Sequence, residues 1–121
     1  MPLTYREDDT HKLVELEVHG KITKADYDEV IPKVQAFIDQ HGTIRLLEVV
    51  EDFSGFEISV LWPGIKFDIQ NLKHISHVAV VSDTGWIGAL AKAAGSFMST
   101  KLRTFDLSEL AEARAWIRKP E

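Results

Sequence analysis

The chain has 121 residues with 27% charged side chains, which fits one globular domain over residues 1–121. It has no cysteine and a formal net charge of −5, which excludes disulfides and thiolate sites and argues against nucleic acid as a partner. The longest stretch free of Asp, Glu, Lys and Arg is residues 74–82. We therefore expect no membrane-spanning helix. Residues 1–9 have no apolar core of the kind that a signal peptide needs, so we also expect a cytoplasmic protein.

The N-terminal residues are predicted to form a hairpin. Apolar and polar side chains alternate over residues 14–19, which is typical of a strand with one buried face. Residues 3–6 are expected to pair with this strand across a polar turn at residues 7–10. Gly20 is predicted to end the second strand.

A helix is predicted after the hairpin. Thr23 and Asp26 have the spacing of a capping box at a helix start. Apolar residues then recur every three or four positions over residues 27–38. Pro32 is expected to break or kink this helix, and Gly42 is expected to end it.

The next part of the chain contains two continuous apolar runs. Residues 44–50 and 78–81 are rich in branched and aliphatic side chains, as in parallel strands that are covered on both faces. The segment between them, residues 53–75, is interrupted at Pro63 and Gly64. Its second part places four apolar residues near one helical face: Ile65, Ile69, Leu72 and Ile75.

The C-terminal part is predicted to contain a helix, a strand and a closing helix. These are residues 86–98, 102–105 and 108–118, and Asp106 and Glu109 can cap the closing helix. The alternation of strands and helices points to an α/β fold with right-handed crossovers.

Several short motifs occur along this order of elements. They are Arg45-Leu46-Leu47-Glu48, Phe53-Ser54-Gly55-Phe56, Leu72-Lys73-His74, Val78-Ala79-Val80-Val81-Ser82-Asp83 followed by Trp86, then Phe105 and Glu112-Ala113-Arg114-Ala115-Trp116-Ile117. Together they resemble the SpoIIAA-like branch of the STAS domain family over nearly the whole chain. The resemblance implies a mixed sheet of four to five mostly parallel strands with an N-terminal hairpin strand, packed by about four helices. It also implies a regulatory or ligand-binding module rather than an enzyme.

The same resemblance points to Ser54. STAS anti-sigma-factor antagonists carry an Asp-Ser pair at the start of the second helix, and its serine is phosphorylated. Ser54 is the only candidate in register here, and Phe53 separates it from Asp52. A regulatory protein-interaction module that is switched by phosphorylation at Ser54 is therefore one hypothesis for function.

Catalytic and metal chemistry find little support in the sequence. No nucleophile–base pairing can be assembled, so we expect no catalytic residue and no cofactor. His74 and His77 have a ligand-like spacing, but they straddle a predicted helix end and strand start, so no metal site is predicted. The acidic pairs at residues 8–9 and 51–52 are interpreted as solvated loops.

An anion site is a candidate at residues 83–85. Asp83, Thr84 and Gly85 lie between a buried strand and a predicted helix, whose first N–H groups favour an anion. The alternative is that one of these polar side chains only caps the helix.

The sequence also has a surplus of apolar side chains. The predicted helix at residues 86–98 is apolar over almost half of its circumference. On the predicted helix that begins at residue 65, Phe67 lies on the side away from the apolar stripe. The surplus can serve as extra core, as a partner or homodimer interface, or as an apolar pocket. The leading hypothesis is an apolar or lipid-like small ligand bound between residues 53–75 and 86–98, with weak, transient membrane association. The residues predicted to bind it are Phe53, Phe56, Leu61, Trp62, Phe67, Trp86 and Leu90.

Overall fold

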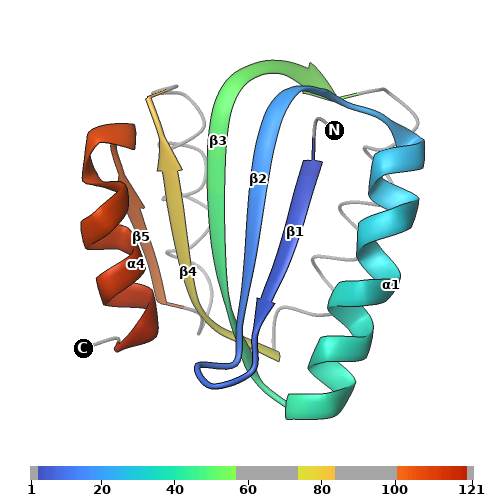
Figure 1. The fold of residues 1–121 in the computed structure, drawn as a ribbon, viewed down its shortest axis with the longest axis vertical. Helices are drawn as coiled ribbons and strands as arrows, with labels where there is room; N and C mark the ends of the chain where they lie inside the picture. Colours follow the sequence, from blue (N-terminus) through green and yellow to red (C-terminus); the bar gives the residue numbers. More distant parts are fainter. Residues whose placement is uncertain (1–2, 57–73, 84–100, 120–121) are drawn as a thin grey trace.

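The computed structural model describes residues 3–56, 74–83 and 101–119, and these form a five-stranded sheet with helices (Figure 1). The strands lie in chain order from β1 to β5; β1 is antiparallel to β2, and all other neighbours are parallel. The predicted α/β class and mixed sheet are confirmed. The elements are β1 (Leu3–Asp8), β2 (Leu13–Ile22), α1 (Lys24–His41), β3 (Ile44–Phe56), β4 (Ile75–Ser82), β5 (Lys101–Phe105), the short 3-10 helix η2 (Leu107–Glu109) and α4 (Leu110–Arg118).

The two described α-helices cover opposite faces of the sheet. Successive residues of a strand point to opposite faces, and in β2 the neighbours Leu13 and Val14 belong to different buried clusters. The cluster on the α1 face contains Val14, Val30, Val34, Phe37, Ile38 and Ile44. The cluster on the α4 face contains Leu13, Leu47, Val49, Ala79, Val81, Phe105, Ala113 and Ile117.

Helix α1 begins and ends where the sequence indicates. The backbone N–H of Asp26 donates to Thr23 Oγ1 at 3.2 Å, and the backbone N–H of Thr23 donates to Asp26 Oδ2 at 3.0 Å. Gly42 ends the helix with a φ of 80° and donates its N–H to the carbonyl of Ile38 at 2.7 Å. Of the two expectations for Pro32, the break is wrong, because α1 runs through this residue, and the kink stays a prediction. The proline lacks one backbone donor, but apolar residues on both sides of it are buried against the sheet.

Strands β2 and β3 are longer than predicted. Gly20 does not end β2; it has a φ of 74° and lies at a register shift beyond which β2 continues to Ile22. The partner strand β3 continues to Phe56, so residues 51–52 lie in a strand and not in the predicted loop. Irregularities of this kind insert extra residues into one strand while the pairing continues, which is why a turn-favouring glycine does not stop the ladder here.

The C-terminal elements follow the prediction closely. β5 and α4 match the predicted strand and helix, and the backbone N–H of Asp106 donates to Glu109 Oε1 at 2.9 Å. Ile75 is the first residue of β4 and packs on the α1 face, so its predicted place on a helix is wrong. Of the helix predicted at residues 65–75, residues 65–73 lie outside the described residues. The whole helix predicted at residues 86–98 lies outside them as well.

Candidate functional site

The α4 face of the β1–β2 hairpin carries charged side chains. Leu13 points to this face and is buried beneath α4, and Glu15 and Glu17 follow on the same face of β2. On β1, Arg6 is the register partner of Glu15. On this face of β2, the first residue is therefore part of the hydrophobic core, and the next two are carboxylates, although β2 has a neighbouring strand on each side.

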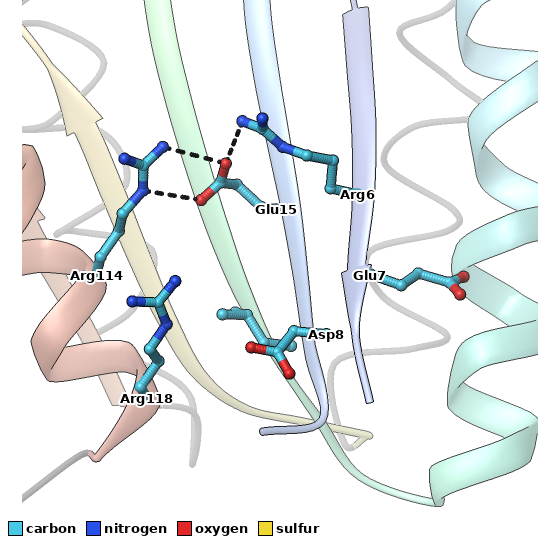
Figure 2. Close-up of a pocket in the computed structure, with 7 residues that line it drawn as sticks. Arg6, Glu7, Asp8, Glu15, Arg114 and Arg118 are labelled. Atoms are coloured by element: carbon cyan, nitrogen blue, oxygen red, sulfur yellow. Dashed lines mark hydrogen bonds and ion pairs between the residues drawn. The ribbon is translucent and has the colours of Figure 1, made fainter. Parts of the chain in front are cut away.

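Glu15 is the centre of this group. Arg114 of α4 donates from Nε to Glu15 Oε1 at 3.1 Å and from Nη2 to Glu15 Oε2 at 3.3 Å, and Arg6 Nη2 donates to the same carboxylate (Figure 2). Arg6 also donates to Glu17, whose Oε1 lies 4.0 Å from Arg114 Nη2. The side chain of Glu15 is 13% exposed. Two-point Arg–carboxylate contacts fix orientation as well as charge, so the network ties the hairpin to α4 in one geometry.

A pocket of about 470 Å³ opens beside this network. Figure 2 shows Arg114 and Arg118 projecting from α4 toward β2, and Glu7 pointing to the opposite side, toward α1. The carbonyls of Ile117 and Arg118 accept hydrogen bonds from Arg45 Nη1 at 3.2 and 2.8 Å, which anchors the last turn of α4 on β3. The lining residues are Arg6, Glu7, Asp8, Leu13, Glu15, Arg114 and Arg118.

Asp8 closes the pocket at the hairpin turn. Its Oδ1 accepts the backbone N–H of His11 at 3.2 Å, and its Oδ2 lies 2.7 Å from His11 Nδ1. Burial raises the pKa of Asp8, but the hydrogen bonds and charge of His11 outweigh it and hold that pKa below its ordinary value. Asp8 is therefore an ionised carboxylate with a local partner. We call Arg6, Glu15, Glu17, Arg114 and Arg118 the charged surface.

A second polar group lies on the same face over β4 and β5. His77 packs edge-on against Trp116 at a ring-centroid distance of 5.8 Å, and the Arg103 guanidinium lies 5.4 Å from the Trp116 ring centroid. Burial lowers the pKa of His77, and the positive charges of Arg45 and Lys101 lower it further. The folded state thus favours neutral His77.

This pKa shift predicts a pH dependence of stability. As the pH falls through about 6.5, the ordinary histidine value, the unfolded chain takes up a proton that folded His77 binds less readily. The free energy of unfolding should therefore decrease from about pH 7.5 to about pH 5.5. Urea unfolding at both pH values should show a smaller decrease for His77→Gln than for the wild type. Equal decreases would contradict the assignment.

Three of the residues predicted to bind a ligand or to be phosphorylated lie in β3. Phe53, Ser54 and Phe56 belong to its last four residues, beyond Val50, which is the last β3 residue in the register with β4. In the register with β2, Asp52 and Ser54 are the residues passed over at the two shifts. Ser54 thus lies in a strand here, whereas the resemblance implies a helix start.

Asp83 is the described member of the candidate anion site. It follows β4, and its Oδ1 accepts the backbone N–H of Leu107 at 2.9 Å, at the start of η2. Its carboxylate thus caps the C-terminal helical segment. The other predicted site residues lie outside the described residues: Leu61, Trp62, Phe67, Thr84, Gly85, Trp86 and Leu90.

The described ranges hold neither a metal-binding cluster nor a membrane-spanning helix. His77 lies in β4 and His74 precedes it, and residues 3–56, 74–83 and 101–119 contain no group of three His, Asp or Glu side chains arranged to hold a metal ion. In the same ranges no helix is long and apolar enough to span a bilayer.

The charged surface was not among the sites predicted from the sequence, although a signal for it exists. Glu15 and Glu17 alternate with apolar residues, which indicates a solvent-facing side. β2 lies inside the sheet of an α/β fold, however, so that helices can cover its faces. Carboxylates on a covered face need hydrogen-bond or ion-pair partners. Arg114, which lies 99 positions from Glu15, supplies the second contact.

The comparisons with known proteins agree with this architecture. The SpoIIAA-like family model matches residues 13–118. A crystal structure of an uncharacterized protein of the DUF3478 family from Shewanella loihica PV-4, with a SpoIIAA-like fold, superposes with a TM-score of 0.79 at 17% identity, over 95% of this chain and 91% of that chain. The search of curated proteins gave no match. Because the family model spans most of its length, the chain belongs to the SpoIIAA-like family.

Proposed function

We propose that this chain is a non-enzymatic regulatory module that binds a protein partner through the charged surface. Its SpoIIAA-like fold supports a regulatory or interaction module. The observation that carries the proposal is the pair of carboxylates on β2, held by arginines from β1 and α4 beside a pocket of about 470 Å³.

The physical support is preorganisation. Two of the three arginine side chains of the charged surface, Arg6 and Arg114, lose freedom in the isolated protein, because Glu15 and Glu17 already hold them. A partner that meets fixed charges loses less entropy on binding. Complementary charge also favours one orientation and suppresses wrong partners.

The test is quantitative affinity capture from cell extract with matched charge variants. Arg6 and Lys33 lie on different faces and have similarly exposed side chains, 53% and 50%. We expect a captured protein to be retained about ten-fold less by Arg6→Gln and equally by Lys33→Gln. Identical capture by both variants and the wild type would refute the proposal.

A second candidate is an apolar or lipid-like ligand with weak membrane association. The feature that favours it is the end of β3, where Phe53 and Phe56 follow the last residue registered with β4, next in sequence to Leu61, Trp62 and Phe67. Burial of one large apolar side chain contributes about 1.5–3 kcal/mol, so membrane contact would be reversible. Vesicle co-sedimentation and native mass spectrometry test it, with reduced binding expected for Trp62→Ala. No vesicle binding and no carried ligand would refute it.

Phosphorylation of Ser54 is the switch that would accompany a regulatory role. Ser54 is one of the residues passed over in the β2–β3 register, and a phosphate there would add two negative charges at most near the strand end. Incubation with cell extract and ATP, followed by mass spectrometry, should find phosphate on Ser54 and none on the Ser54→Ala chain. Finding no phosphate on Ser54 in the wild type would contradict this switch.

A further inference from the structure

We infer that the pocket between α4 and the β1–β2 hairpin binds an oxyanion, a carboxylate or a phosphate group, through Arg118, Arg114 and Arg6. The inference rests on the proposed function and names the chemical group that the pocket recognises. The basis is a difference between the charged groups of the pocket: the carboxylates already have partners, and the arginines keep unused N–H donors.

The carboxylates of the pocket are engaged within the protein. Both oxygens of Glu15 accept hydrogen bonds from arginines, and both oxygens of Asp8 contact His11. Glu7 accepts a hydrogen bond from the Tyr5 hydroxyl on the other side of the hairpin. The carboxylates of the lining thus already have partners within the protein, and Glu7 points away from α4.

The cations of the pocket keep unused donors. Among the described residues, the Arg118 side chain makes no ion pair or hydrogen bond, although its backbone carbonyl accepts one from Arg45. Arg6 donates through Nη2, and Arg114 donates through Nε and Nη2, so Nη1 of each is unused in the same set of contacts. Guanidinium groups match carboxylate and phosphate oxygens with two parallel donors. The lining therefore balances in formal charge, with three arginines and three carboxylates, but the Arg118 guanidinium and further N–H groups of Arg6 and Arg114 remain available as donors.

The volume of the pocket indicates the size of the molecule that bears the oxyanion. Small-molecule sites usually span about 300–1,000 Å³, and 470 Å³ exceeds what a bare phosphate needs. Leu13 adds one apolar lining residue next to the charges. The pocket thus suits an oxyanion attached to a short carbon chain, either an acidic side chain of a partner or a small organic acid or phosphate. Because the chain as a whole carries a net charge of −5, attraction is local, and free anions should bind weakly.

The test is an NMR titration of the isotope-labelled protein with sodium phosphate and, separately, with sodium succinate at constant ionic strength. The arginine Nε–Hε signals and the amide of Glu15 should shift saturably. Arg118→Gln should weaken binding about ten-fold or more, since it removes a charge-assisted contact. Lys119→Gln removes the same charge from the next residue, which does not line the pocket, and should change binding less than about two-fold. Thermal unfolding checks that both variants are folded.

The outcomes separate the inference from the proposed function. Absence of saturable shifts with either anion, or equal weakening by both variants, would overturn the inference even if capture of a partner depends on Arg6. If succinate or phosphate displaces a captured partner, the oxyanion belongs to that partner. If the anions bind without displacing it, the pocket takes a free small molecule. Either of these last results supports the inference.

Discussion

Replacing Phe37 by alanine should lower the free energy of unfolding by about 3–5 kcal/mol. Phe37 is 1% exposed and lies in the buried cluster that holds α1 on β2 and β3. Its ring centroid lies 4.4 Å from that of His41. The substitution would therefore remove a large apolar group and leave a cavity that the rigid sheet fills poorly. Urea unfolding monitored by circular dichroism measures the change.

The matched control for this substitution is Gln40→Ala. Gln40 is an exposed residue of the same helix, so its replacement should change the free energy of unfolding by less than about 0.5 kcal/mol. A loss below about 1 kcal/mol for Phe37→Ala would contradict the placement of α1 on the sheet.

Replacing Glu15 by glutamine should lower the free energy of unfolding by about 1–2 kcal/mol. The substitution keeps the shape of the side chain but removes the charge that Arg114 and Arg6 contact. Arg6 is more than half exposed and contributes little through screened charge, so most of the loss should come from the two-point contact with Arg114. Glu29→Gln, which removes an exposed pair with Lys33 at 3.8 Å, should cost less than about 0.5 kcal/mol.

A double-mutant cycle isolates this contact. Glu15→Gln, Arg114→Gln and the double variant should show a coupling of about 0.5–2 kcal/mol that decreases with added salt. Additive effects of the two substitutions would mean that the contact across 99 positions does not form in solution.

Much of the fold could be predicted because its signals are local. The capping residues Thr23 and Asp26, the stop at Gly42 and the period-two alternation in β2 each depend on neighbours within a few positions. The errors arose where tertiary pairing overrides a local rule. Gly20 favours a turn, yet β2 continues because β3 offers further residues to pair with it, and Pro32 stays inside α1 because the helix is held by burial on both sides of it.

The charged surface could not be assembled from the sequence for a related reason. Alternation indicates which side chains of β2 share a face, but it does not say which face a distant helix covers. The position of Arg114 opposite Glu15 depends on the docking of α4 through Ala113 and Ile117. The order of strands in the sheet also sets how far α4 lies from β2, and this order depends on pairing between segments that are distant in the sequence.

The apolar-ligand hypothesis concerns another part of the chain. It depends on side chains such as Trp62, Phe67 and Trp86, which lie outside the described residues, so it remains a prediction from the sequence. The two hypotheses differ in location: one uses the hairpin and α4, and the other uses the end of β3 and the residues after it.

Hydrogen–deuterium exchange of the protein with and without its captured partner tests the central claim most directly. If the charged surface is the binding site, amides of β1, of the first half of β2 and of the last turn of α4 should exchange more slowly in the complex, while α1 keeps its rate. Protection limited to α1, or to residues 53–73, with no change in the hairpin would contradict the account.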